Sequence, residues 1–512
     1  MRCQRARWRT DKVNFIWNFP LFSIVLSLFS GPLCFMLSGK AAKRYTIIYE
    51  LTLVVMCAAV LGYVLQTGQP FTYVMGEFPA PWGNEIRAGV LEALFALCFM
   101  IIMLASVVGG FQFVKQDIDE SKINLYYALI NLMTAAIMAL LWTNDIFTGY
   151  VFLEILTLTS CGISVVREMG RTTLAAVRYM ILNLVGSGLF LLGVVLFYDL
   201  TGHLLMVPMQ AAVAELAQDP QTLMVMSISL GVLTIGLAIK SGLFPFHFWM
   251  PDTYGFSTPT SASILSSLVS KAYILLLFKI YYRCIGIEVF EIMPIRNILL
   301  ILGVCGMVFG SISAMHANTV NRMVAFSSAA QIGYIYMGFG IGGEFGYVAA
   351  LFHILAHAFT KSLLFLTTPR LADVSGGSAA FKNLQGSGMR DRHAGIAFIM
   401  GAFSMIGIPG LAGFCSKMFF GLAGVRRGDN LVLVLVMLAL AASSLLNAIY
   451  FIRTCIRIYT EPAQDAPWKL VKAQPIAAYD IPMIVLITAN LVLGLLSTTI
   501  INLIQQGLSM FG

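Results

Sequence analysis

The sequence is poor in charge. Charged residues make up 11% of its 512 residues, whereas hydrophobic residues make up 59%. A soluble domain carries about 25% charged residues. The shortage extends along the whole chain, with no separate region of different composition. This excludes an ordinary soluble domain and predicts one integral, all-α membrane protein.

Cofactor signatures are also lacking. The nine cysteines, such as Cys34 and Cys57, are scattered without a C-x-x-C pair or a Cys/His ligand spacing, so we expect packing roles and no metal site. No G-x-G-x-x-G follows a predicted strand, and no G-x-x-x-x-G-K-[ST] occurs, which disfavours an ATP-driven pump. The net charge of +8 lies mainly in short loops and predicts no nucleic-acid partner.

Apolar runs long enough to cross a lipid bilayer are what the sequence has in abundance. A spanning helix needs about 20 such residues, and we count about fourteen candidates. They lie near 15–37, 46–65, 89–112, 125–142, 146–166, 173–198, 224–249, 260–282, 297–315, 320–341, 345–368, 395–424, 431–452 and 479–505. The run after Lys12 is expected to be the first span and not a removed signal peptide.

Basic loop residues predict the orientation, because they favour the cytoplasmic side. With both termini outside, most of them fall inside, although the basic tail Arg2–Lys12 argues the other way. The inside set is Lys40, Lys43, Arg44, Lys115, Lys122, Arg167, Arg171, Arg322, Arg370, Lys382, Arg390, Arg392, Arg453, Arg457, Lys469 and Lys472, and the outside set is Arg87, Arg283, Arg296, Arg426 and Arg427.

Three connecting segments have a composition of their own. Gln69–Arg87 is rich in proline and glycine and predicts a compact extracellular structure. Leu204–Leu216 predicts a short amphipathic segment at the membrane surface. Leu371–His393 is polar, glycine-rich and basic, which suits a cytoplasmic surface that meets partners.

Charged residues deep inside the apolar runs are the strongest functional signal. They are Glu154, Lys240, Lys361 and Lys417, with Lys271 as a fifth candidate. A charge at membrane depth is costly, so it normally faces protein or water and marks an ion path. Glu154 is the only charged residue of its run, and Lys240 is its natural partner. A contact that forms and breaks would drive proton uptake and release; the alternative is a static ion pair.

Prolines near two of these lysines predict broken helices. Pro245 follows Lys240 by five residues, and Pro409 precedes Lys417 by eight. A proline removes a backbone donor and leaves room for polar groups beside the charge. The breaks fall in the seventh and twelfth candidate helices, an offset that suggests a repeat of five helices.

A polar stripe runs through the eleventh candidate helix. His353, His357 and Lys361 recur every four residues and therefore share one face. We expect a hydrated ridge that passes protons. Metal binding by the two histidines is disfavoured because no carboxylate or cysteine lies near them in sequence, and polar packing between helices is a third interpretation.

Four further residues are weaker candidates. Lys271 has several serines beside it, and its role is either functional or in packing. His247 is a candidate for a proton exit. Lys279 is expected to snorkel to the interface. Arg178 has Glu168 or a partner subunit as possible partners, and the sequence does not choose between them.

Five motifs together point to a family. They are Leu237–Pro251 followed by Asp252 and Pro259-Thr-Ser-Ala, Phe152-Leu-Glu154, Ala325–Tyr334, His353-x-x-x-His-Ala-Phe-x-Lys361, and Gly407-Ile-Pro-x-x-x-Gly-Phe-x-Ser-Lys417. The set resembles the antiporter-like subunits of respiratory complex I, of Mrp sodium/proton antiporters and of complex I-related membrane-bound hydrogenases. The motifs are specific for this family but not for one branch of it.

The resemblance implies about fourteen helices, two inverted five-helix repeats, and broken helices 7 and 12. It implies a proton relay along a hydrated axis in the membrane plane. Its parts would be an input pair, a bridging lysine, a central relay and a terminal relay: Glu154 with Lys240, Lys271, Lys361 and Lys417, respectively. One departure is the loop Thr319-Val-Asn321-Arg322, where the family usually has an Asp and a Lys-Arg pair. An ion pair at this loop is therefore in doubt.

Four units follow from this reading. They are residues 1–124 (helices 1–3 with the extracellular loop), 125–283 (first five-helix repeat), 297–453 (second repeat) and 454–512 (the C-terminal loop and helix 14).

The sequence thus predicts a proton-translocating, antiporter-like subunit in the cell membrane, part of a multisubunit redox-driven or Mrp-type complex. Other membrane subunits would be its partners, and any redox cofactors would belong to them. One alternative is a sodium/proton antiporter subunit without redox coupling; another is a non-transporting scaffold. Few acids lie within the membrane, which favours protons over sodium, although a partner chain could bind sodium.

Overall fold

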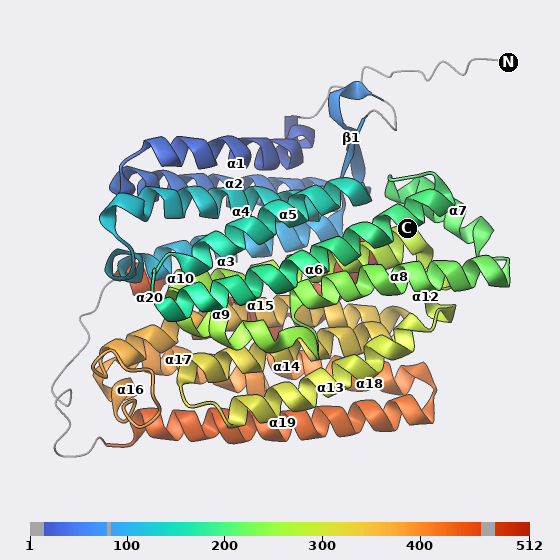
Figure 1. Cartoon of the computed structure of the whole chain (residues 1–512). Helices are drawn as coiled ribbons and strands as arrows, with labels where there is room; N and C mark the ends of the chain where they lie inside the picture. Colours follow the sequence, from blue (N-terminus) through green and yellow to red (C-terminus); the bar gives the residue numbers. More distant parts are fainter. Residues whose placement is uncertain (1–14, 79–82, 462–476, 512) are drawn as a thin grey trace.

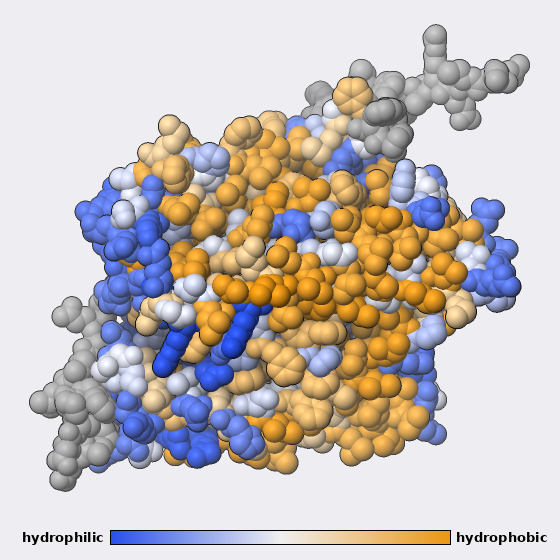
Figure 2. Space-filling model, in the orientation of Figure 1, coloured by the Kyte–Doolittle hydropathy of each residue, from blue (hydrophilic) through white to orange (hydrophobic). Residues whose placement is uncertain are grey.

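The computed structural model describes residues 15–78, 83–461 and 477–511. In these ranges, twelve helices are long and apolar enough to cross a membrane, and a bent pair near the C-terminus is a thirteenth candidate. The helices lie side by side in one bundle (Figure 1), whose flank is hydrophobic between two more hydrophilic ends (Figure 2). The predicted helical membrane protein is confirmed, while the count of fourteen and the inverted repeats stay predictions.

The helices have the following bounds. The first half contains α1 (Phe19–Met36), α2 (Gly39–Thr67), α3 (Val90–Asp117), α4 (Ile123–Trp142), α5 (Ile146–Val165), α6 (Gly170–Thr201), the short α7 (Met206–Leu216) and α8 (Pro220–Ser241). The second half contains α9 (Met250–Phe256), α10 (Pro259–Ile264), α11 (Ser270–Lys279), α12 (Ile287–Ile292), α13 (Ile295–Met315), α14 (Val320–Ile341), α15 (Gly343–Asp373), α16 (Ser387–Arg390), α17 (Arg392–Ile406), α18 (Ala412–Arg427), α19 (Asn430–Tyr459), α20 (Ala477–Leu495) and α21 (Ser497–Ser509).

Aspartates fix several helix starts. The first backbone N–H groups of a helix have no partner within it, and an aspartate carboxylate just before the helix can accept from them. Asp145 accepts from the Thr148 N–H at 2.6 Å and starts α5, and Asp391 accepts from the Ala394 N–H at 3.0 Å and starts α17. These polar caps lie at the ends of apolar helices, where the chain leaves the membrane.

Both predicted helix breaks are present. The α8 helix ends at Ser241, Gly242 has φ +80°, and a short 3-10 turn from Phe246 leads into α9, so Pro245 lies inside the break. Likewise, α17 and α18 are separated by Gly407 with φ +97°, Pro409 and Gly410 with φ +89°. Positive φ values suit glycine because it lacks a Cβ. Each break thus lies next to the end of a helix that carries or faces a lysine.

The last predicted span, near 479–505, is sharply bent in the structure. It is two helices, α20 and α21, bent by 80° across Leu496. The apolar run gave no sign of the bend because both arms are hydrophobic on the side that packs inward. Between α10 and α12, the predicted span near 260–282 contains two π-helical turns, Leu265–Val269 and Ile280–Gly286, which flank α11.

The innermost helices carry the central lysines. The apolar windows of the α10–α12 segment and of α15 are wholly buried, and that of α14 is almost so, whereas α19 and α6 are mostly exposed on the flank. Charges on the inner helices therefore face protein and not lipid. This arrangement is what the cost of an intramembrane charge demands.

A small hairpin interrupts the otherwise helical fold. Strand β1 (Phe71–Val74) pairs antiparallel with β2 (Glu85–Ala88), so the predicted compact structure in Gln69–Arg87 is real. The Trp17 ring stacks on Phe71, and Arg87 donates to the Met510 carbonyl. The two ends of the chain, as far as described, thus lie on one side of the bundle (Figure 1). The basic tail Arg2–Lys12, Pro79, Pro81, Lys469 and Lys472 lie outside the described residues.

Candidate functional site

Glu154 and Lys240 form a close pair between α5 and α8. The Glu154 Oε1 and Lys240 Nζ atoms are 3.8 Å apart, which is an ion-pair distance but too long for a hydrogen bond. Instead, Lys240 Nζ donates to Thr157 Oγ1 at 2.7 Å. The Lys240 side chain is fully buried, while 23% of the Glu154 side chain is exposed. The carboxylate is thus held near the ammonium without being locked to it.

Lys271 lies on α11 among hydroxyl groups. Its Nζ donates to the Ser266 carbonyl and, at 3.1 Å, to Ser270 Oγ. Ser266 Oγ lies 3.0 Å from Ser328 Oγ on α14. No carboxylate pairs with Lys271 within the described chain. The predicted serine-lined environment of Lys271 is therefore present in the structure.

Lys361 lies on α15 and reaches across to α14. Its Nζ donates to the Val324 carbonyl at 2.9 Å and to Ser327 Oγ. The side chain is fully buried. Neutral oxygens are again the only acceptors the described residues provide, and a buried charge without a counter-ion is costly.

The two histidines of the stripe stack one turn apart on α15. Their rings are 5.9 Å apart and nearly parallel, at 3°. His353 Nδ1 lies 2.6 Å from Ser416 Oγ on α18, and its ring stacks on Tyr334 at 5.2 Å. The His353 Nε2 atom and both ring nitrogens of His357 are buried without a hydrogen-bond partner among the described residues. These nitrogens are the groups through which a proton could pass.

Lys417 uses the second helix break. Its Nζ donates to the carbonyls of Met405 at 3.0 Å and Ile406 at 2.7 Å, the last two residues of α17. The last four carbonyls of a helix have no partner within it, and here two of them accept from the lysine. The ammonium also lies 5.7 Å from the centre of the Tyr334 ring. The break around Pro409 therefore provides the lysine with acceptors.

The structure brings most of the predicted residues into one electrostatic neighbourhood. Lys271 lies within interaction range of His353, His357 and Lys361, and Lys417 lies within range of His353. Tyr273 connects this group to the input pair, since its ring is 5.5 Å from Lys240 Nζ and its hydroxyl is 3.1 Å from Thr157 Oγ1.

His247 is not brought into this row. It is buried between the rings of Phe244 and Phe248, at 5.7 and 4.9 Å, and its Nδ1 has no hydrogen-bond partner among the described residues. Its neighbours are aromatic because the motif places phenylalanines on both sides of it. Its role as a proton exit stays a prediction.

One weaker expectation was wrong and another is settled only in part. Lys279 does not snorkel: it is buried, and its Nζ donates to the carbonyls of Leu141 and Thr143, both at 2.7 Å. Within this chain Arg178 pairs not with Glu168 but with Asp252, at 3.2 Å, and a contact of Arg178 with a partner subunit stays a prediction. In both cases the partner lies far away in sequence, where no spacing rule reaches it.

An ion pair does exist at the loop before α14. Arg322 Nη2 lies 3.1 Å from Asp252, the acid at the end of the α8–α9 motif. The doubt raised by Thr319-Val-Asn321-Arg322 is therefore resolved by a partner in another motif. Sequence reasoning also missed Glu50 on α2, which is fully buried and accepts from Thr134 Oγ1 at 2.7 Å.

Metal binding finds no support in the geometry. The described residues contain no group of three or more His, Cys, Asp or Glu side chains placed to hold a metal ion. The free thiols are mostly buried in apolar surroundings. The expectation that this chain carries no cofactor stays a prediction.

Comparison with known proteins places this site in a context. The family model described as "NADH:quinone oxidoreductase/Mrp antiporter, TM" matches residues 143–443, a range that contains all five candidate charged residues. The chain is 29% identical to NADH-quinone oxidoreductase subunit N of Desulforudis audaxviator (strain MP104C), covering 96% of this chain and 98% of that protein. It is 28% identical to a Na(+)/H(+) antiporter subunit of Alkalihalophilus pseudofirmus, covering 73% of each.

Solved structures show the same architecture. A chain of the membrane-bound sulfane sulfur reductase, an archaeal respiratory membrane complex, aligns with a TM-score of 0.85 and 26% identity over 96% of this chain and 97% of that one. A chain of the Mrp complex from Dietzia sp. DQ12-45-1b aligns with a TM-score of 0.85 and 20% identity, over 96% and 97% of the two chains. The second likeness concerns the fold alone.

Proposed function

Because the chain belongs to the NADH:quinone oxidoreductase/Mrp antiporter transmembrane family, we propose that it is a proton-translocating, antiporter-like subunit of a multisubunit membrane complex. The observation that carries this proposal is the set of buried and half-buried lysines whose ammonium groups have hydroxyl and carbonyl acceptors; within the described residues, Lys240 is the one member of this set with a nearby carboxylate. A hydroxyl or carbonyl oxygen can accept a hydrogen bond from the charged ammonium form of lysine and also from its neutral amine form. The lysines can therefore exchange protons.

The first step takes place at the input pair. An event in a partner subunit changes the distance between Glu154 and Lys240, now 3.8 Å. When the carboxylate is near, it stabilises the charged lysine; when it moves away, the ammonium loses that support and gives up its proton or repels the next cation. The Glu154 Oε1 atom accepts no hydrogen bond from the residues that the structure describes, so little opposes a movement of this carboxylate.

The change in the charge of Lys240 then affects the titratable groups on the inner helices. Lys271 lies within electrostatic range of both histidines and of Lys361, so a proton gained at one site disfavours a proton at the next. The stacked imidazoles of His353 and His357 lead towards α18. Lys417, half-buried at the second break, is the terminal relay that releases the proton.

The driving force divides the family into branches. Relatives of this chain include subunits named for NADH-quinone oxidoreductase and for Na(+)/H(+) antiporters, and both kinds of assembly are compatible with the site. If the assembly is redox-driven, its redox cofactors lie in partner subunits. The alternative, a sodium/proton antiporter subunit, would have to bind sodium at carboxylates of another chain, because Glu154 is the only acid in this row.

Two further expectations belong to this proposal. The helices of residues 125–283 and 297–453 form two five-helix repeats, with units 1–124 and 454–512 at the ends of the chain. Both termini lie outside the cell, and the chain resides in the cell membrane among other membrane subunits.

The proposal predicts that Lys361→Ala abolishes proton transport by the intact assembly. The assembly, purified with its co-purifying subunits and reconstituted in liposomes, would be energised and followed with a pH-sensitive dye. Lys279→Ala is the matched control, because Lys279 is also a buried lysine that donates to carbonyls but lies outside the row. We expect transport near the wild-type rate in the control and none in Lys361→Ala.

Normal transport in Lys361→Ala, with assembly intact, would support a scaffold whose buried charges only stabilise packing. Sodium flux distinguishes the antiporter alternative. Radioactive sodium taken up in exchange for protons, without an electron donor, would favour that alternative over redox-driven proton translocation.

A further inference from the structure

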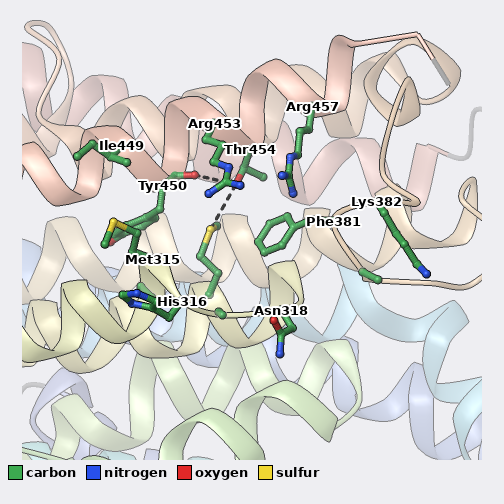
Figure 3. Close-up of a pocket in the computed structure, with 14 residues that line it drawn as sticks. Met315, His316, Asn318, Phe381, Lys382, Ile449, Tyr450, Arg453, Thr454 and Arg457 are labelled. Carbon is green, nitrogen blue, oxygen red and sulfur yellow. Dashed lines mark hydrogen bonds between the residues drawn. The ribbon is translucent and has the colours of Figure 1, made fainter. Parts of the chain in front are cut away.

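A second polar region lies away from the proton relay. A cavity of about 520 Å³ opens where α13 ends and α14 begins, beside the outer helix α19 (Figure 3). Its walls come from four places: Met315 and His316 at the end of α13, Met323 on α14, Phe381 and Lys382 in the loop after α15, and the last turns of α19. None of the residues assigned to the relay lines it.

Cationic side chains dominate this cavity. Arg453 and Arg457 extend from α19 towards Phe381 (Figure 3), and Lys382 lies at the rim. The guanidinium of Arg457 lies over the Phe381 ring, 5.4 Å from its centre. None of the lining residues is acidic, and no ion pair joins these three cations within the described ranges. Two arginines one turn apart on the same face of α19, with no acid among the lining residues, favour an anionic ligand.

The cavity also has an apolar side that faces lipid. Met315 and Ile449 belong to its lining. On the same helix, Ile452 and Ile456 are 45% and 62% exposed, so apolar surface runs alongside both arginines. The helix has 30 residues, a length of about 45 Å, whereas the hydrocarbon layer is about 30 Å thick. The last turns of α19 therefore reach the depth of lipid headgroups.

Hydrogen bonds join the helices that form the cavity. Thr454 Oγ1 donates to the Tyr450 carbonyl at 2.8 Å and to Met323 Sδ at 3.3 Å, which ties α19 to α14. Ser311 Oγ lies 3.1 Å from Ser443 Oγ and connects α13 to α19.

We propose that this cavity binds an anionic glycerophospholipid, with the phosphate at Arg453 and Arg457 and an acyl chain against Met315 and Ile449. The planar guanidinium groups can each donate two hydrogen bonds to phosphate oxygens. The three cations belong to the side predicted to be cytoplasmic, where anionic lipid is concentrated. A free phosphate shares the headgroup chemistry but would leave the apolar wall unused.

Binding of short-chain lipids to the purified full-length chain, with whatever subunits accompany it, tests the proposal. The probes are dioctanoyl phosphatidylglycerol, dioctanoyl phosphatidylcholine and inorganic phosphate, followed by thermophoresis in a neutral detergent. We expect saturable binding of phosphatidylglycerol alone. Arg453→Gln with Arg457→Gln should weaken it about 30-fold, since each basic residue near a surface contributes about a factor of five.

The matched control removes two other arginines. Arg171 and Arg392 are exposed and do not line the cavity, so Arg171→Gln with Arg392→Gln lowers the charge equally and should bind like wild type. Arg453→Lys with Arg457→Lys keeps the charge and should bind the lipid more tightly than the glutamine variant does. An unfolding midpoint in the glutamine variant equal to that of wild type excludes misfolding as the cause of its loss.

Equal lipid binding by the Arg453→Gln, Arg457→Gln variant and wild type would overturn the proposal. So would inorganic phosphate that displaces the lipid at equal concentration, because the cavity would then take a soluble anion. The assay measures no transport, so its result is independent of the proposed function.

Discussion

Buried lysines need acceptors that tolerate both of their charge states. In this protein the ammonium groups of Lys240, Lys361 and Lys417 donate to hydroxyl or backbone carbonyl oxygens. A carboxylate partner in contact would fix the charged form, because breaking a buried ion pair is strongly unfavourable. Neutral oxygens favour neither the protonated nor the neutral form of lysine strongly. A neighbouring charge can then determine which form is populated, and a proton relay requires this.

The pair Glu154–Lys240 provides the first test at this scale. Glu154→Gln removes the negative charge that lies 3.8 Å from Lys240 and keeps the shape of the side chain. We expect proton transport to fall about tenfold or more, because a charge contact in a low-dielectric interior is worth well over 1 kcal/mol. The measurement is dye-reported acidification in proteoliposomes of the intact assembly.

Glu50→Gln is its control. Glu50 is also a buried membrane carboxylate, but among the described residues it accepts only from Thr134, and it lies outside the family-matched range. Its replacement should leave transport near the wild-type rate. If both variants lose transport equally, Glu154 has no special role as the input carboxylate, and transport requires buried carboxylates in general.

Helix breaks act at the scale of the element. In both broken spans the chain leaves the helix through a glycine in a left-handed conformation, Gly242 after Lys240 and Gly407 before Lys417. A Cβ added to Gly407 would lie 3.1 Å from Lys417 Cδ, whereas one added to Gly428 would meet nothing within 4 Å. Comparing substitutions at Gly407 and Gly428 therefore distinguishes the effect of backbone strain from the effect of a contact with Lys417.

Gly407→Ala is expected to reduce transport, and Gly428→Ala is not. Both substitutions place a side chain at positive φ and should destabilise the protein by about 1–2 kcal/mol each. Only the first also displaces the Lys417 side chain from the α17 carbonyls. Thermal unfolding of the purified assembly should shift similarly for both variants. A transport defect of equal size in both would show that strain alone is responsible.

The positions of spans and helix breaks could be predicted from the sequence where a feature of the same segment determines them. Apolar length predicted the spans, and Pro245 and Pro409 predicted the breaks, because each acts on its own helix. The 80° bend after Leu495 and the burial of Lys279 depend on what packs against them, and no local pattern carries that information. The same reason hides the partner of Arg178: Asp252 is brought near it by the packing of α9 against α6.

At the scale of the whole molecule, the bundle places the central lysines of its charged row, Lys271 and Lys361, on its innermost helices. The α10–α12 segment, α14 and α15 are buried almost throughout their apolar windows, whereas most of the apolar windows of α6 and α19 are not buried. The candidate residues sit on five helices, so their positions relative to one another depend on packing. Sequence motifs predicted which residues take part, but their distances followed only from the structure.

The orientation of the bundle is open to direct labelling. Ser509, near the hairpin side, and Ser121, on the opposite side, are both exposed. In a variant with Cys3→Ser, we expect Ser509→Cys to react with an impermeant maleimide on intact cells. Ser121→Cys should react only after permeabilisation. The reverse pattern would contradict the predicted outside position of both termini, and equal labelling would contradict the arrangement in Figure 1.

The most direct test of the central claim is proton transport by an assembly that carries Lys240→Arg. Arginine keeps the positive charge beside Glu154 but stays protonated at any pH the protein survives. A relay that depends on proton exchange at this position predicts an intact complex, purified in normal yield, whose transport is lost. Transport at the wild-type rate would show that Lys240 serves only as a fixed charge, and it would contradict the account.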